Sequence, residues 1–213
     1  MKRVFLLLML SVLLLCSCAS ARPFTRAEDG SGYTDTRAER FYLALAPAFE
    51  PASAGDIYGE YHDKERDVTR TFRVIPELDH TQFLTDENLI VYFAGETAPD
   101  PAAWQLQAAL VCEEDAISVE RLRLTAEEHG ELLTLLQTTW FEGEGGEQLP
   151  LGAPAYTRRI KLTSAAYPNL FYCFTLHAYE NGEGYFYDAV NRRTVRVPDA
   201  LLTALYPNQT EES

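Results

Sequence analysis

Residues 170–188, which read LFYCFTLHAYENGEGYFYD, contain the pattern that decides the fold class. Two runs rich in aromatic and other apolar residues flank Asn181-Gly182, a dipeptide typical of the tight turn of a β-hairpin. Gly and Asn supply the positive backbone angles that such a turn requires. This stretch therefore predicts two antiparallel strands joined by a short turn.

The hairpin belongs to a longer antiparallel meander. Residues 159–163 and 194–197 form further β-prone runs on either side, and Asp188 and Asn191 bracket the turn into the last one. Successive side chains of a strand point to opposite faces of its sheet. We expect Phe174, Leu176 and Phe186 on the core face, and Tyr185 and Tyr187 on the other.

The preceding half of the chain predicts more strands. Residues 57–62 and 68–75 flank the charged turn DKERD, and residues 106–112 and 117–124 flank EEDA, so each pair is typical of a hairpin. Residues 88–94, NLIVYFA, form a strongly β-prone run. Residues 40–46 are apolar at both alternating positions, so a strand and a short helix both remain open there.

One helix has a clear sequence signature. Thr125 and Glu128 have the spacing of a capping box, in which each side chain bonds the other residue's amide. Leu132, Leu133 and Leu136 then form an apolar stripe at helical spacing. We expect this helix over about 125–139, and a second, shorter helix over 199–205 after Pro198.

These elements predict a single globular α+β domain over residues 37–207. It would contain a mainly antiparallel β-meander sheet, the amphipathic helix, and the short C-terminal helix packed on the sheet. Residues 208–213 are expected to form a disordered tail.

The charge balance limits the partners. The chain of 213 residues has 32 acidic and 18 basic residues, for a formal net charge of −14. Nucleic-acid binding needs clustered Lys and Arg, so we expect no nucleic-acid partner.

The N-terminus has the order of a secretory signal peptide. Lys2 and Arg3 give a cationic start, and an almost wholly apolar run follows over residues 4–15. That run of about 12 residues is shorter than the roughly 20 of a membrane-spanning helix. Its end, Leu15-Cys16-Ser17-Cys18, resembles the lipobox of bacterial lipoproteins, with Cys18 as the lipidated residue. Cys16 fits less well, because bulky Leu15 would then precede the lipidated cysteine.

The resemblance implies a location and an anchor. Residues 1–17 would be removed, and acyl chains on Cys18 would hold the protein in the lipid bilayer on the extracytoplasmic side of the cell membrane. In an organism with two membranes, Ala19 after Cys18 favours the outer membrane. Residues 18–36 are small and polar, with Gly-Ser-Gly at 30–32, so they predict a flexible tether.

Two cysteines remain in the expected mature body, Cys112 and Cys173. Outside the cytoplasm they can form one disulfide. Two buried free thiols on strands are the alternative, because free Cys packs as a small hydrophobic residue.

Chemistry-bearing motifs are sparse. The sequence contains no GxSxG, HExxH, SxxK, GxxxxGK[ST] or GxGxxG pattern, and no close pair among its four histidines. We therefore expect no catalytic residue, metal site or cofactor. The best candidate binding surface consists of Tyr179, Tyr185 and Tyr187, which can stack on a glycan or peptide or simply be half-buried strand residues. Five arginines lie near it in sequence: Arg158, Arg159, Arg192, Arg193 and Arg196.

These observations favour a membrane-anchored lipoprotein with a non-catalytic binding domain for an envelope protein or glycan. Two alternatives remain open: an inhibitor or assembly lipoprotein that acts through a protein interface, and an envelope hydrolase without a familiar motif.

Overall fold

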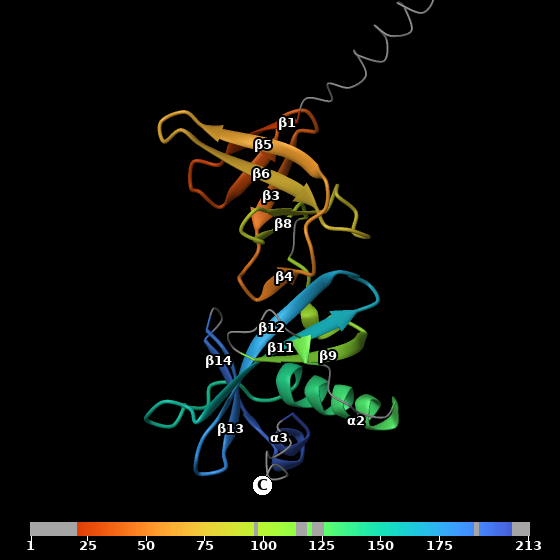
Figure 1. The fold of residues 1–213 in the computed structure, drawn as a ribbon, viewed down its shortest axis with the longest axis vertical. Helices are drawn as coiled ribbons and strands as arrows, with labels where there is room; N and C mark the ends of the chain where they lie inside the picture. Colours follow the sequence, from red (N-terminus) through yellow and green to blue (C-terminus); the bar gives the residue numbers. More distant parts are fainter. Residues whose placement is uncertain (1–20, 96–97, 114–118, 121–125, 190–191, 206–213) are drawn as a thin grey trace, which may run out of the picture.

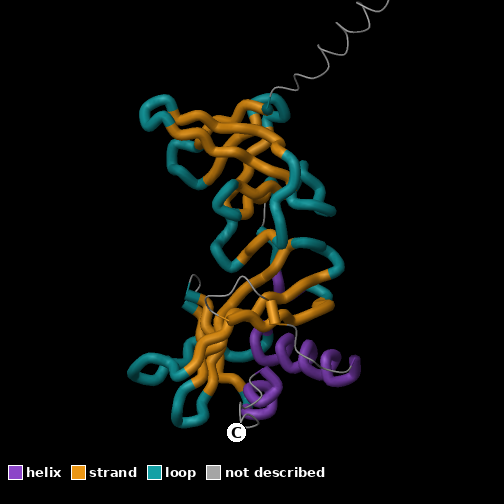
Figure 2. Tube along the Cα trace, in the orientation of Figure 1, coloured by secondary structure: helices purple, strands orange, loops and turns teal. Residues whose placement is uncertain are grey.

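The protein is mainly β, with two short helices (Figures 1 and 2). The computed structural model describes residues 21–95, 98–113, 119–120, 126–189 and 192–205. A closed barrel of seven strands lies at one end of the long axis, and a second sheet with the helices lies at the other. Among the described residues, no helix combines the length and apolar character needed to cross a membrane.

The barrel is formed by the first part of the chain, in the order β1-β2-β3-β8-β7-β6-β5. Neighbours are antiparallel except β1 and β5, which close the barrel in parallel. Its strands are β1 (Arg22–Arg26), β2 (Gly32–Asp35), β3 (Arg40–Ala44), β5 (Ile57–Asp63), β6 (Val68–Val74), β7 (Phe83–Asp86) and β8 (Val91–Phe93). Gly59 permits the closure, because a Cβ there would lie 2.6 Å from the Arg22 carbonyl oxygen.

Aromatic rings fill the barrel interior. Phe24 on β1 stacks on Phe72 of β6 with ring centroids 4.4 Å apart. Tyr33 and Tyr92 meet Phe72 edge-on at 5.0 and 5.3 Å. Such contacts add to the stabilisation that burial of the rings provides. The closed sheet is therefore held by side chains from strands that are distant in sequence.

The second sheet is antiparallel, in the order β10-β9-β11-β12-β13-β14. Its strands are β9 (Leu106–Glu113), β10 (Val119–Glu120), β11 (Tyr156–Ser164), β12 (Leu170–Ala178), β13 (Gly184–Asp188) and β14 (Arg193–Val197). The predicted meander over residues 159–197 is confirmed, and Gly182, in the turn between β12 and β13, has a φ of +84°. The predicted hairpin of β5 and β6 is also confirmed.

Both helices pack on one face of this sheet. Helix α2 (Ala126–Leu136) continues into a π-helical turn over Gln137–Phe141, and α3 (Asp199–Leu205) follows β14. A short 3₁₀ turn, η1 (Pro101–Ala103), precedes β9. The predicted apolar residues of the helix and of the sheet's core face are buried together. They include Leu132, Leu136, Phe174, Leu176 and Phe186.

Strand β4 (Phe49–Pro51) joins the two parts of the structure. It follows barrel strand β3 along the chain but pairs with β12, with Glu50 opposite Phe171. The Phe49 ring then packs against the rings of Trp104 and Tyr172, with ring centroids 6.1 and 5.6 Å apart. One apolar cluster accordingly contains residues of β4, of the barrel end and of the second sheet.

In three barrel hairpins, an aspartate carboxylate accepts hydrogen bonds from backbone amides of its own turn. Asp35 accepts the amides of Arg37 and Ala38 at 2.9 and 3.1 Å. Asp63 and Asp86 do the same in the turns after β5 and β7. Each of these turns contains a non-glycine residue with positive φ, namely Glu39, Asp67 or Leu89. Aspartate favours such turns because its short side chain mimics a backbone acceptor.

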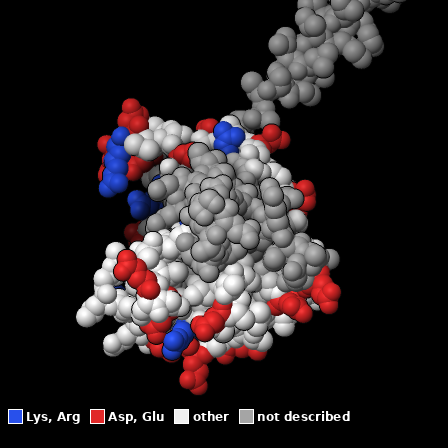
Figure 3. All heavy atoms as spheres, turned by 60° about the horizontal axis from the view of Figure 1, so that its bottom comes forward, with Lys and Arg blue, Asp and Glu red and all other residues white. Residues whose placement is uncertain are grey.

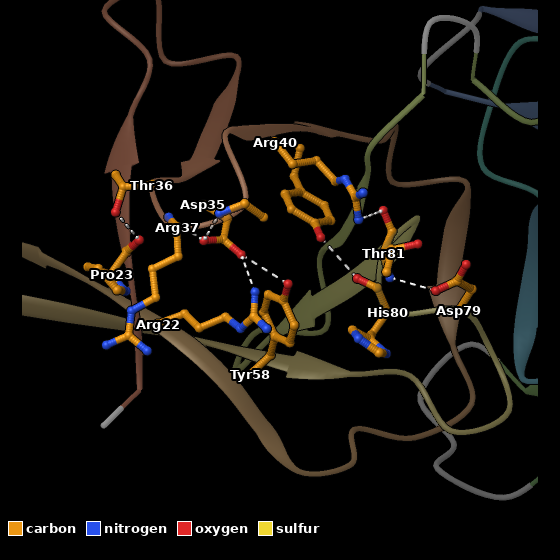
Figure 4. Close-up of polar contacts among 12 residues, drawn as sticks. Arg22, Pro23, Asp35, Thr36, Arg37, Arg40, Tyr58, Asp79, His80 and Thr81 are labelled. Atoms are coloured by element: carbon orange, nitrogen blue, oxygen red, sulfur yellow. Dashed lines mark hydrogen bonds and ion pairs between the residues drawn. The ribbon is translucent and has the colours of Figure 1, made fainter. Parts of the chain in front are cut away.

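Asp35 also centres a buried polar network (Figure 4). Its Oδ2 accepts from the Tyr58 hydroxyl at 2.9 Å and from Arg22 at 3.2 Å. Burial alone raises the pKa of Asp35, but the bonds from Ala38, Tyr58, Arg37 and Arg22 together outweigh it and hold that pKa below its ordinary value.

Several sequence predictions are wrong in this part of the chain. Residues 22–35 are not a tether, because β1 and β2 lie there, and the folded body begins before residue 37. At residues 40–46, where a strand and a short helix both remained open, the structure has strand β3; β7 is a strand that the sequence did not predict. The helical share is smaller than an α+β class implies. The capping box of Thr125 and Glu128, the expected tail 208–213 and Cys18 lie outside the described residues and side chains.

We predict that Asp35→Ala destabilises the barrel by about 3–5 kcal/mol, because it leaves Arg22, Tyr58 and two amides without their shared acceptor. Urea unfolding followed by circular dichroism measures this loss. The depressed pKa means that the contribution of Asp35 is present above the carboxyl's unfolded-state pKa and is lost as pH falls through its lower folded pKa. Asp29→Ala, at an exposed turn, is the matched control and should have little effect; equal effects from both variants would contradict the prediction.

Candidate functional site

The predicted aromatic surface is only partly exposed. The three tyrosines lie as β12 and β13 place them, and Tyr185 and Tyr187 share the sheet face opposite the helices. Tyr185 is buried, with Tyr179 edge-on at 5.9 Å and its hydroxyl 3.3 Å from Glu183. Burial raises the pKa of Tyr185. Tyr187 instead lies against His177, at 5.4 Å between rings. The geometry corresponds to half-buried strand residues, not to a continuous stacking platform.

The five arginines separate into different roles. Arg158 stacks over Tyr156 at 3.9 Å, and Arg196 pairs with Glu183 at 3.1 Å. Arg192 is exposed in the turn before β14. Arg193 donates to the carbonyls of Trp140 and Gly143 at 2.7 and 2.8 Å, so it secures the end of the π-helical turn. Arg159 lines a hollow of the sheet surface.

That hollow is a crevice where β12 changes partners. Residues 175–178 of β12 pair with β13, whereas residues 170–172 pair with β4. Between these two ladders, the Cys173 amide bonds only to the Ala48 carbonyl in the segment before β4, at 2.7 Å. The gap leaves a crevice of about 160 Å³. Its lining residues are Pro47, Ala48, Arg159, Cys173, Phe174, Thr175, Tyr187, Asp188 and Ala189.

A cross-strand row of polar side chains forms the floor of the crevice. Arg159 of β11 lies opposite Thr175 of β12, and Thr175 lies opposite Tyr187 of β13. Since directly opposed residues share a face, all three side chains project from the sheet face away from the helices. We refer to this side as the polar face.

Two cations share one carboxylate beside the crevice. Glu50 of β4 receives Arg159 on Oε1 and the Lys161 ammonium on Oε2 at 2.7 Å. The Arg159 side chain remains 40% exposed, and its buried Nε has no hydrogen-bond partner. The group therefore has one net positive charge and a guanidinium that the protein only partly satisfies.

Both cysteines are free thiols on this polar face. Cys112 lies opposite Arg159, and Cys173 lies opposite Lys161, so β11 separates them. Two strand spacings place their Cα atoms about 10 Å or more apart, which is too far for a disulfide. Burial raises the pKa of Cys173 to about 12, so its thiol is a poor nucleophile.

The histidines lie on separate elements. His62 is on β5, His80 in the loop before β7, His129 on α2 and His177 on β12. Within the described ranges, no group of three or more His, Cys, Asp or Glu residues is placed to hold a metal ion.

Comparison with known proteins adds no relationship. No protein-family model, curated protein or solved structure matches this chain. The properties of the site therefore rest on its own geometry.

Sequence reasoning named Arg159 but missed its partners. Glu50 lies 109 positions from Arg159, in a strand of three residues that ends in proline. No local pattern reports that pairing. The alternation Arg159-Ile160-Lys161, which places two cations on one face of a predicted strand, was the available signal.

We predict that Cys112 and Cys173 both remain free in the oxidised protein. Alkylation in denaturant without reductant should add two labels to the peptides that contain them, as measured by mass spectrometry. A Cys112–Cys173 cross-linked peptide in the unreduced digest would contradict the observed strand order.

We also predict that Arg193→Lys lowers the free energy of unfolding by about 1–3 kcal/mol. The shorter lysine side chain would lose the two hydrogen bonds that the guanidinium donates to the carbonyls of Trp140 and Gly143. Thermal unfolding or urea titration measures the change. Arg192→Lys, at the neighbouring exposed position, is the control and should unfold like the parent protein. Equal losses from the two substitutions would show that Arg193 has no special role.

Proposed function

We propose that this protein is a lipid-anchored, extracytoplasmic lipoprotein that presents a non-catalytic binding domain at the cell envelope. The observation that carries the proposal is the sequence Leu15-Cys16-Ser17-Cys18 at the end of an apolar signal run, immediately before a folded body. Acyl chains on Cys18 would supply the membrane contact, and two or more chains hold stably.

The fold supports a close attachment of the barrel to the membrane. β1 begins at Arg22, so at most about 14 Å of extended chain separates it from Cys18. A tether over residues 18–36 would have allowed roughly 25 Å. β1 lies on the side of the barrel remote from the second sheet (Figure 1). In this arrangement the barrel acts as a spacer, and the second sheet extends away from the bilayer.

The charge distribution is compatible with that orientation. Residues 21–44 contain four arginines and four acidic residues, whereas residues 45–213 contain 12 basic and 28 acidic ones. Acidic side chains are spread over the face of the molecule drawn in Figure 3. Anionic lipid repels negative charge, and the whole barrel region, residues 21–95, contains 8 basic and 14 acidic residues. The neutral segment next to Cys18 is therefore the part of the barrel that approaches a membrane at the lowest electrostatic cost.

The polar face of the second sheet supports the binding role. It offers a crevice lined by the partly exposed Arg159 and by Thr175 and Tyr187, whereas burial raises the pKa of the Cys173 thiol there to about 12. Hydrogen-bonding groups around a small hollow are suited to recognition, and they lack an activated nucleophile.

We predict that Cys18→Ser abolishes acylation. The wild-type chain should appear in the membrane fraction with the mass of residues 18–213 plus acyl chains. The variant should remain as an uncleaved precursor or appear as a soluble product without acyl mass. Membrane fractionation with intact-mass spectrometry measures both outcomes.

Cys16→Ser is the matched control, because it removes a cysteine two positions away and should leave acylation unchanged. A Cys18→Ser protein that stays in the membrane with the wild-type mature mass would overturn the proposal. Loss of acylation in the Cys16 variant alone would move the anchor to Cys16.

A further inference from the structure

We infer that the crevice between β4 and β13 is a binding site for a carboxylate group. The inference rests on the proposed binding role and names its ligand class. Three observations carry it: the cavity, a net positive charge in a strongly acidic chain, and a row of donors on rigid strands.

The charge selects a monoanion. Arg159 and Lys161 together face one carboxylate, Glu50, so one positive charge remains for a ligand. A dianionic phosphate would add a second negative charge close to Glu50. A carboxylate matches the remaining charge, and planar guanidinium groups bind carboxylates with good geometry.

The donors have suitable positions. Arg159, whose side chain is 40% exposed, lines the crevice, and Thr175 and Tyr187 follow it across the sheet. Hydroxyl groups can donate to a carboxylate oxygen that Arg159 also binds. Glu50 already occupies one side of the guanidinium and fixes its orientation, so the ligand meets a group that is partly ordered in advance.

The crevice is small and open on one side. Its volume of about 160 Å³ gives room for a carboxylate with a small substituent, and the open side leaves the length of the ligand unrestricted. The ligand is thus either a small free carboxylate or the carboxylate end of a longer chain that leaves through the open side. A small free carboxylate has few atoms and binds with a dissociation constant on the order of 1 mM.

The test uses the full chain in detergent and follows the Arg159 Nε–H resonance by ¹H–¹⁵N NMR during titration with sodium acetate. We expect a saturable shift with acetate and none with acetamide, which has the same shape without the charge. Arg159→Gln should abolish saturable shifts of the neighbouring Thr175 amide. Arg196→Gln should retain them, because it removes the same charge from another ion pair of the polar face, 58% exposed.

The acetate–acetamide comparison needs no variant, so it stands even if Arg159→Gln unfolds the protein. Equal shifts with both compounds, equal loss in the two variants, or no saturation at about 100 mM acetate would overturn the inference. A second titration uses tri-alanine, which has a free C-terminal carboxylate. If it binds more tightly than acetate, the ligand is the carboxylate end of a peptide chain. If the two affinities are equal, the ligand is a small free acid. These measurements do not depend on acylation, so their failure is distinguishable from failure of the lipid anchor.

Discussion

Strand β12 has two different neighbours along one edge, and the rest of the structure depends on this divided ladder. Its last residues, 175–178, pair with β13 and continue the meander, whereas residues 170–172 pair with β4, which the chain brings from the barrel. The backbone bonds of β4 thus place Phe49 against Trp104 and Tyr172 and make one apolar cluster of both parts. Without that short pairing, barrel and sheet would share few directional contacts. The crevice is the geometric consequence, since two strands that diverge from one edge cannot both fill it.

In the barrel, two kinds of contact stabilise short strands that have polar sequences. Its turns are fixed locally by Asp35, Asp63 and Asp86, each of which bonds the amides of its own turn. Its interior is fixed over long range, because rings from strands that are distant in sequence meet there. Asp86 also receives Arg70 at 2.8 Å and the Tyr92 hydroxyl at 3.0 Å. Asp35 and Asp86 therefore each end a strand and bond a tyrosine hydroxyl of the barrel, whereas Asp63 bonds only its own turn. Removal of either buried carboxylate would leave its arginine without that ion pair.

These two arrangements explain what the sequence could and could not predict. The C-terminal meander was readable because alternation and Asn181-Gly182 are local signals. RPFTR and GYTD at β1 and β2 are short and polar, so they read as a tether. They become strands only because β5 closes on β1 and because Phe24 stacks on Phe72, 48 positions away. The same reasoning applies to the site: Arg159 is visible in a β-prone run, but Glu50 and the gap at Cys173 exist only in the folded sheet. Tertiary contacts decided every element that local pattern missed.

The position of Arg159 on an interior strand is a reason why a small polar crevice can select an anion. β11 is an interior strand, paired with β9 on one side and β12 on the other, so the backbone under Arg159 is held by two ladders. Its guanidinium is then oriented by Glu50 from a third strand. A cation on an edge strand or loop would have to be ordered by its ligand, and that entropy would reduce the affinity. In a chain with a net charge of −14, such a pre-ordered positive group also draws anions to one place, because the surrounding acidic surface repels them elsewhere.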